Sequence, residues 1–434
     1  MNTDEMAHFI QDAKYKDLSP GVVEQAKLCF LDFLGVSLAG SRSRSGEIMR
    51  SIINSEGPST IIGGSKASAS DASLVNGVSA HSLDLDDGHR LAQLHPGACV
   101  IPAALSLAES EELSGREFLV ALVVGYQVAV SLGIMVNPSH RNIGFHSTGT
   151  CGTFAAAAAA GKVLKLSEDE ILNCLGLAGT QAAGLLESDH SGSMAKHLHP
   201  GRAAQSGVIS ALISQRGFTG ARSILEGEEG FLNSMCQLHD KQNEFKVLPD
   251  SSYHISGVYF KNYPVCRHLH SALDATLYLS QKYEINPRDV VEVKVKTYQI
   301  AAEHHDYNAQ EPEAIRQSLP VTVALAIFQG HLEPKELQVN EDILNLASRV
   351  SIECDPSFEA LYPGNRPAQV RMNTIQGSFE KTVHLPRGEP EEPFKWDDLL
   401  FKFKTLNPQF DVDTLDIIKK MESYNLNDLM TILS

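Results

Sequence analysis

Four short stretches of the chain place ionisable side chains next to breaks in apolar segments. The densest, 191–207, holds a group of basic residues directly before the apolar run 208–213: Lys196, His197, His199 and Arg202. Pro200 and Gly201 are expected to interrupt the chain between these charges and that run. Charge runs are usually solvated surface, but the apolar, glycine-rich flanks favour a Lys196 that holds an anionic substrate or reacts with it. A lysine can also form an imine with a carbonyl substrate.

A second stretch, 81–96, combines three carboxylates with three histidines: Asp84, Asp86 and Asp87 with His81, His89 and His95. One interpretation is a helix end followed by a solvated loop. Another is a metal site, but the spacing matches no zinc or EF-hand signature, so no metal is expected. The third is acid–base chemistry, in which a carboxylate orients a histidine and raises its basicity.

A third stretch, 144–153, opens a helix with glycines and places His146 just before the helix N-terminus. The free N–H groups of such a terminus can hold a carboxylate. A phosphate loop would require GxGxxG or GxxxxGK[ST]; the stretch has neither, so a nucleotide site is not expected. A capped helix with a surface histidine explains the same residues equally well.

The fourth stretch, 261–274, places His268 and His270 at the start of another helix, from which they could reach across a cleft to a second domain. Cys266 as a nucleophile is the alternative. Without a Cys/His/Asn signature, a structural cysteine is expected instead. The basic residues of the stretch, Lys261 and Arg267, are candidates for binding the substrate, as is Arg202.

Together these stretches supply histidines, a lysine and arginines without a cofactor fingerprint. Such groups suit the removal of a proton next to a carboxylate. A neutral histidine takes the proton, cations stabilise the enolate-like charge, and a second group protonates a leaving group or the opposite face. The sequence therefore predicts an enzyme that acts on a small carboxylate without a cofactor.

Composition sets the class of protein. A length of 434 residues predicts two domains, and 43% apolar with 21% charged residues is typical of a soluble globular protein. The formal net charge of −17 argues against nucleic acid or an anionic membrane as partner, because both need a basic surface. Seven scattered cysteines without a CxxC pair, and an N-terminus without an apolar signal core, predict a cytoplasmic protein. The longest apolar run, 118–134, predicts a buried helix that falls short of a membrane span.

Periodicity predicts the domain organisation. Up to about residue 245, most segments are helical, and several are apolar nearly all round. Such helices predict a large helical domain and an extensive contact with a second copy in a homodimer. Further along, strands are expected among helices, at 290–298, 350–354, 368–374 and 379–385. The predicted fold is mostly α: an all-α domain from 1–259 and 390–434, and a smaller α+β lid domain at 260–389.

The same four stretches resemble the MmgE/PrpD family. The matching segments follow the family's order over most of the first 275 residues: VNGVSAHSLDLDDGHR, HPGACVIPAAL, GFHSTGTCGTFAAAAAAGKVLKL, KHLHPGRAAQSG and YFKNYPVCRHLHSALDA. The family includes 2-methylcitrate dehydratase, cis-aconitate decarboxylase and iminodisuccinate epimerase. The resemblance implies a helical domain built from both chain ends, a lid domain, a homodimer, and an active site between the domains without a cofactor.

The resemblance also implies positions for the site residues. The residues of the decarboxylase pattern fall on Asp84, His95, His146, Lys196 and His270, with His268 as a competitor for the last. Gly88 stands where that pattern has a threonine, and Val321 where it has a lid tyrosine. These two departures argue against strict cis-aconitate decarboxylation and leave proton abstraction untouched.

The first expectation is therefore a lyase that dehydrates or decarboxylates a small di- or tricarboxylate, of the methylcitrate or aconitate type. Epimerisation of an iminodisuccinate-like compound is the alternative, because inversion requires the same proton removal. Two other classes stay open: a metal-dependent hydrolase that uses the cluster between His81 and His95, and a non-catalytic carboxylate-binding protein.

Overall fold

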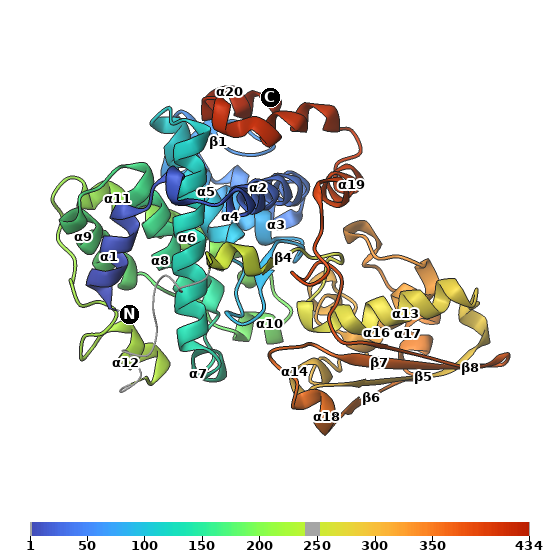
Figure 1. Cartoon of the computed structure of the whole chain (residues 1–434). Helices are drawn as coiled ribbons and strands as arrows, with labels where there is room; N and C mark the ends of the chain where they lie inside the picture. The colour runs from blue at the N-terminus through green and yellow to red at the C-terminus, as the bar shows by residue number, and fades with distance from the viewer. Residues whose placement is uncertain (1, 239–251, 434) are drawn as a thin grey trace. The chain divides into compact units, whose positions relative to one another are not determined.

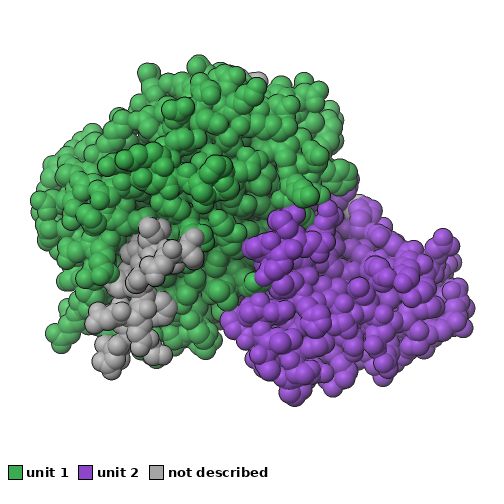
Figure 2. Space-filling view, viewed as in Figure 1, with its two compact units in different colours: residues 1–187, 194–260, 394–434 green, residues 188–193, 261–393 purple. Residues whose placement is uncertain are grey.

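A computed structural model of the chain describes residues 2–238 and 252–433. The chain forms two compact units (Figure 2). Unit 1 contains residues 1–187, 194–260 and 394–434, and unit 2 contains residues 188–193 and 261–393. Both ends of the chain thus belong to unit 1. No local sequence pattern indicates that the short segment 188–193 belongs with unit 2.

Unit 1 is built mainly from helices, and Figure 1 shows their order along the chain. They are α1 (Thr3–Asp12), α2 (Pro20–Gly40), α3 (Arg44–Ser51), α4 (Ala69–His81), α5 (Gly97–Ser110), α6 (Gly115–Val136), α7 (Ser139–Asn142), α8 (Ser147–Val163), α9 (Glu168–Gly179), α11 (Ala195–Ser214), α12 (Phe231–Cys236), α19 (Trp396–Leu406) and α20 (Leu426–Met430). Helix α10 (Glu187–His190) begins at the last residue of this part of unit 1. The C-terminal helices α19 and α20 pack against α2 and α5, so the two ends of the chain are joined within one core.

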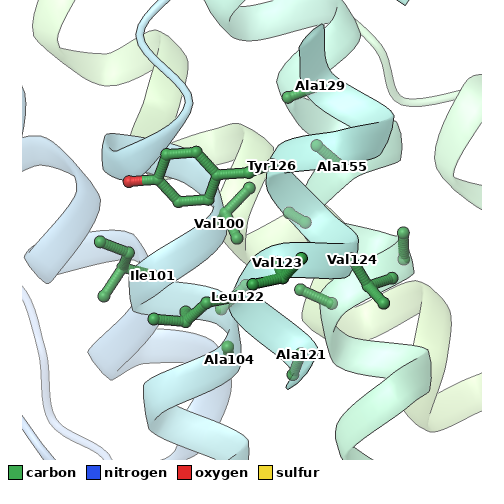
Figure 3. Close-up of a cluster of buried hydrophobic side chains, with 14 of the residues drawn as sticks. Val100, Ile101, Ala104, Ala121, Leu122, Val123, Val124, Tyr126, Ala129 and Ala155 are labelled. Carbon is green, nitrogen blue, oxygen red and sulfur yellow. The ribbon is translucent and has the colours of Figure 1, made fainter. Parts of the chain in front are cut away.

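Helix α6 lies in the middle of this core, between α5 and α8. Figure 3 shows its aliphatic side chains against Val100 and Ile101 of α5 and Ala155 of α8, while the hydroxyl of Tyr126 points away from them. Among the described residues, α6 is the one helix long and apolar enough to cross a membrane, but 94% of its most apolar window is buried inside the protein. It therefore contains the buried helix that the sequence predicts at 118–134.

The prediction of an all-α domain is wrong. The chain is about 57% helical with about 10% strand, which is helix-rich but not all-α. Unit 1 itself contains two small antiparallel pairs: β1 (Ser59–Thr60) with β2 (Lys66–Ala67), and β3 (Gly88–His89) with β4 (Val258–Tyr259). Strands of two residues are too short for the apolar–polar alternation that signals a strand. The β3–β4 pair also joins segments that are far apart in the sequence, which no local pattern can indicate.

Unit 2 is organised around a four-stranded mixed sheet with the order β6-β5-β7-β8. Its strands are β5 (Val290–Thr297), β6 (Val350–Cys354), β7 (Ala368–Thr374) and β8 (Gly377–Val383), and its helices are α13 (His270–Lys282), α14 (Gln299–Ala302), α15 (Pro312–Ile315), α16 (Leu319–Gln329), α17 (Glu341–Ala347) and α18 (Pro356–Glu359). Strand β5 pairs in parallel with β6 and antiparallel with β7, and β7 and β8 form a hairpin. Helices α13 and α16 pack against the sheet.

The expected interruption at Pro200 and Gly201 is also wrong, because α11 runs unbroken from Ala195 to Ser214. A proline within a helix removes one hydrogen bond, here the one to the carbonyl of Lys196. At this point α11 packs closely against α4, which favours the continuous helix: a Cβ on Gly201 would lie 2.6 Å from the carbonyl oxygen of Leu74. Lys196 therefore sits in the first turn of α11, beside the helix that leads to the carboxylate-rich loop.

Candidate active site

Lys196 contacts the loop that follows α4. Its Nζ lies 3.5 Å from Oδ2 of Asp84, and the two side chains are only 11% and 4% exposed. Asp84 has a φ of 50°, in the left-handed region that few residues other than glycine adopt. Aspartate tolerates this conformation, which turns the chain sharply at the end of α4. The pair places a cation and an anion together in an almost dry part of unit 1.

Two histidines beside this pair have defined tautomers. Nδ1 of His81 lies 2.8 Å from Oδ2 of Asp86, and Nδ1 of His95 lies 2.6 Å from the carbonyl oxygen of Asp87. Both oxygens accept hydrogen bonds, so each Nδ1 carries the proton. In the neutral rings, the basic nitrogen is therefore Nε2.

Further imidazole rings surround His81. Its centroid lies 5.0 Å from that of His95, 5.8 Å from that of His146 and 6.4 Å from that of His197. His146 is the N-cap residue of α8, and its Nδ1 lies 2.9 Å from Nδ1 of His199 in α11. One of these two nitrogens must donate a proton to the other. The result is a group of buried and half-buried histidines, next to the loop that carries Asp84, that can pass and accept protons.

A buried carboxyl fixes the chain between the loop and α5. Oδ2 of Asp87 accepts a hydrogen bond from the hydroxyl of Tyr126 at 2.6 Å, and Oδ1 accepts one from the backbone N–H of Gly97 at 3.0 Å. Burial raises the pKa of Asp87 to about 8 despite these hydrogen bonds. The carboxyl is therefore largely protonated at neutral pH. We assign it to holding His95 in place rather than to proton transfer.

This raised pKa predicts a pH-dependent stability. The folded protein binds the proton of Asp87 more tightly than the unfolded chain does, so the stabilisation is complete below about pH 4 and is lost as the pH rises toward about 8. Asp87→Asn cannot ionise. Relative to this variant, the wild-type Tm should fall between about pH 5 and about pH 8 in thermal unfolding. As a control, the surface substitution Asp169→Asn should leave the pH dependence of the wild-type Tm unchanged. A Tm difference between wild type and Asp87→Asn that stays constant across this pH range would contradict the assignment.

Helix α19, near the C-terminal end of the chain, also holds the loop that carries Asp84 and Asp86. Nζ of Lys402 donates to Oδ1 of Asp32 at 2.6 Å and to the carbonyl oxygen of Leu85 at 2.8 Å. Leu85 lies between Asp84 and Asp86 in the loop. Burial raises the pKa of Asp32, and the Lys402 ammonium opposes that rise. Lys402 is thus a positioning residue that ties the loop to the core.

In unit 2, two of the candidates are engaged in the unit's own structure. The Arg267 guanidinium donates to Oε1 of the buried Glu389 at 3.0 Å, and its Nη1 lies 3.0 Å from Nδ1 of His270. The other ring nitrogen of His270, Nε2, lies 3.2 Å from the carbonyl oxygen of Val265. Both nitrogens of His270 are therefore occupied and its side chain is fully buried, which suits a structural role.

His268 is placed differently from His270. It is half-buried, and its Nδ1 lies 2.7 Å from the hydroxyl of Tyr298. Of the two histidines that the sequence leaves in competition, His268 has the more accessible ring.

The structure places the remaining candidates as follows. Arg202 is exposed on α11 and donates to Gln205. Lys261 is fully buried at the start of unit 2. Val321 is buried in the apolar core of unit 2, where a tyrosine hydroxyl would need a polar partner.

One group of residues has the composition of a metal site. Ligand atoms of His81, Asp86 and His95 all lie within 4.8 Å of one another. The two Nδ1 atoms that face this group already carry protons that they donate to oxygen. A metal would have to displace these protons or bind through Nε2. The arrangement therefore fits hydrogen-bonded acid–base groups better than a preformed metal site.

The comparisons with known proteins agree with this organisation. The model of the MmgE/PrpD N-terminal domain matches residues 4–244, and that of the MmgE/PrpD C-terminal domain matches residues 263–422. The chain belongs to the MmgE/PrpD family. The resemblance noted in the sequence is thereby confirmed, and it extends into the C-terminal third.

Several curated MmgE/PrpD relatives are named for one reaction. Cis-aconitate decarboxylase of Aspergillus terreus is 26% identical over 93% of this chain and 89% of its own length. Cis-aconitate decarboxylase of Homo sapiens is 27% identical over 98% and 92%, respectively. A cis-aconitate decarboxylase-like protein of Aspergillus oryzae, oryM, is 31% identical but covers 56% of this chain and 53% of its own.

Some features of this MmgE/PrpD site carry no signal in the sequence. Asp32 lies inside the apolar helix α2, and Lys402 follows Leu85 by 317 residues, so nothing local links either of them to the loop. For Asp32, the apolar residues on either side of it in α2 are a weak indication, because a buried charge requires a partner.

Proposed function

We propose that this protein is a cofactor-independent lyase that transfers a proton at the carbon next to a carboxylate of a small di- or tricarboxylate. The observation that carries the proposal is the buried cluster in unit 1, in which Lys196 and Asp84 lie beside histidines whose basic nitrogen is Nε2. The names of relatives that cover 93% or more of the chain support lyase chemistry. The preferred substrate is an aconitate- or methylcitrate-like acid.

Each group has a role that its surroundings support. Lys196 neutralises a substrate carboxylate and the enolate-like charge that develops beside it, an effect that is strong where water is excluded. Asp84 holds the ammonium in place. His95 exchanges the proton through Nε2, and His146 at the start of α8 binds a second carboxylate or supplies the other proton. Of the two histidines of unit 2, we propose His268, rather than His270, as the one available to a substrate.

Gly88 bears on which acid is used. A Cβ on this residue would lie 2.4 Å from the hydroxyl oxygen of Tyr259, so a threonine would require Tyr259 to move. Tyr259 thus occupies space that a side chain at position 88 would fill. Since Val321 is buried as well, we propose that the substrate pocket differs from that of the decarboxylase pattern.

The test is ¹³C NMR of the purified protein with a panel of acids that includes cis-aconitate, methylcitrate and iminodisuccinate. The proposal expects elimination or loss of CO₂ from at least one di- or tricarboxylate. Turnover of none of them by the folded protein would overturn it. Inversion without elimination would instead favour the epimerase alternative, which the presence of two separate histidines, His95 and His146, supports.

The metal-dependent alternative is separated by chelation. Because the Nδ1 protons of His81 and His95 are used in hydrogen bonds, we expect full activity after exhaustive dialysis against a strong chelator. Activity would be measured before and after treatment, with the metal content determined by elemental analysis. A loss that added Zn²⁺ or Mn²⁺ restores would contradict this prediction and favour the hydrolase class.

The two hydrogen bonds of Lys402 predict that its substitution lowers the catalytic rate, although Lys402 is not proposed to contact the substrate. Lys402→Met removes the hydrogen bond from Lys402 to the carbonyl oxygen of Leu85 and so loosens the loop that carries Asp84 and Asp86. It should therefore lower kcat by about tenfold or more. Steady-state kinetics would measure the effect. The matched control is Lys404→Met, which removes a lysine of the same helix whose Nζ donates to the carbonyl oxygen of Phe410 at the surface. Lys402→Arg should recover part of the rate. Equal kinetics of Lys402→Met and wild type would exclude the positioning role.

A further inference from the structure

We propose that Cys266 of unit 2 is a reactive thiol, activated by His304 and modified by small soft electrophiles and peroxides. Sγ of Cys266 lies 3.7 Å from Nε2 of His304, within hydrogen-bond range for sulfur. The cysteine is half-buried rather than enclosed in a core. The pair belongs to unit 2, and the proposed lyase reaction does not use it.

The orientation of His304 is what makes the pair reactive. Its Nδ1 lies 2.9 Å from the carbonyl oxygen of Gln317, which can only accept, so Nδ1 carries the proton. The basic Nε2 therefore faces the sulfur and can take the thiol proton. A nucleophile, a base within reach, and a third group that orients the base form the arrangement of an activated nucleophile.

The backbone keeps the thiol in this position. The N–H of Cys266 donates to the carbonyl oxygen of Arg316 at 3.0 Å, and the carbonyl oxygen of Cys266 accepts from the N–H of Leu269 at 3.0 Å. The neighbouring carbonyl groups of Arg316 and Gln317 therefore hold the backbone of Cys266 and the ring of His304, respectively. This common support keeps the two residues next to each other.

The other six cysteines lack this arrangement. Five of them are buried: Cys29, Cys99, Cys151, Cys174 and Cys236. Cys236 also lies near a histidine, with Sγ 3.5 Å from Nδ1 of His140, but that nitrogen faces the carbonyl oxygen of Met235 at 2.8 Å and carries the proton. Cys354 is half-buried like Cys266, but carboxylates surround it, and burial together with Glu359 and Asp355 raises the pKa of its thiol. Cys354 is therefore the matched control within the same molecule.

Both modifications need only Cys266, His304 and the added reagent. Cys266 gives its proton to Nε2 of His304, and the thiolate attacks. With iodoacetamide, an S–C bond forms, the C–I bond breaks and iodide leaves. With hydrogen peroxide, an S–O bond forms and the O–O bond breaks; the departing hydroxide takes the proton from the His304 imidazolium to give water, and the cysteine becomes a sulfenic acid.

The experiment treats the folded, full-length protein with limiting iodoacetamide and follows each cysteine by peptide mass spectrometry. Cys266 should be alkylated first, at least about tenfold faster than Cys354. His304→Gln should slow the labelling of Cys266 by about tenfold and leave Cys354 unchanged. A variant that simply unfolds would label both residues faster, so loss of fold cannot imitate this result.

Two outcomes would overturn the proposal. One is labelling of Cys354 as fast as that of Cys266 in the wild-type protein. The other is a Cys266 rate that His304→Gln leaves unchanged while circular dichroism shows the variant to be folded. A second arm with hydrogen peroxide, with sulfenic acid trapped by dimedone, should mark Cys266 and not Cys354, and the opposite order would count against it.

Discussion

Lys196→Ala is expected to lower kcat by at least about 10²-fold on the substrate that the panel identifies. The ammonium group is the cation of the buried cluster, and its partner Asp84 is only 4% exposed. Its removal leaves the developing negative charge of the substrate without a counter-charge in a site with little water. The rate would be measured by NMR or by a coupled assay at saturating substrate.

The control for this substitution is Lys165→Ala, which removes a lysine whose side chain is 67% exposed and pairs with Glu117 at the surface. It should leave kcat within about twofold of wild type. Lys196→Arg keeps the charge but replaces a compact ammonium with a planar fork, so it should restore little activity. Near-normal turnover by Lys196→Ala would remove this residue from the site and reduce the cluster to a structural ion pair.

His146→Ala is the second substitution with a large expected effect, again at least about 10²-fold in kcat. Its ring is 5.8 Å from that of His81 and shares a proton with His199 across 2.9 Å. Although His146 is the N-cap of α8, its side chain makes no capping hydrogen bond. The substitution should therefore leave the helix intact, and Tm should change little while the rate falls.

Two further variants sharpen this prediction. His199→Ala removes the partner of His146 but keeps the His146 ring beside His81, so its effect on kcat should be smaller than that of His146→Ala. His8→Ala removes a histidine that is 65% exposed and should have no effect. If His146→Ala turned over substrate as fast as His8→Ala, the proton-transfer or binding role proposed for His146 would be wrong.

Much of the fold is visible in the sequence because long segments carry their own pattern. The alternation in 290–298 and the apolar run at 118–134 predict β5 and the core of α6. The failures occur where the deciding contact is remote. Gly88 and His89 form a strand only because Val258 and Tyr259 lie beside them. Pro200 stays helical because a neighbouring helix packs against it at Gly201.

The site divides in the same way. Lys196, His146 and the loop around Asp84 could be singled out, because unusual residue types are concentrated within a few positions. What supports them could not: Lys402 reaches the loop from the last helices, and Tyr126 reaches Asp87 from the middle of an apolar helix. Nor could the sequence decide between His268 and His270, since the difference lies in the contacts of Arg267 and Val265.

Proton transfer at carbon is tested most directly by the deuterium content of the recovered substrate and the product after turnover in D₂O. We expect the wild-type protein to introduce solvent deuterium at the carbon next to a carboxylate, and Lys196→Ala and His146→Ala to slow this incorporation together with the overall rate. NMR and mass spectrometry would locate the label. Complete decarboxylation or inversion by the wild-type protein without any deuterium at that carbon would contradict the proposed chemistry. An elimination leaves no hydrogen at that carbon in its product, so there the contradicting result is a substrate deuterated at that carbon that keeps its label through complete turnover.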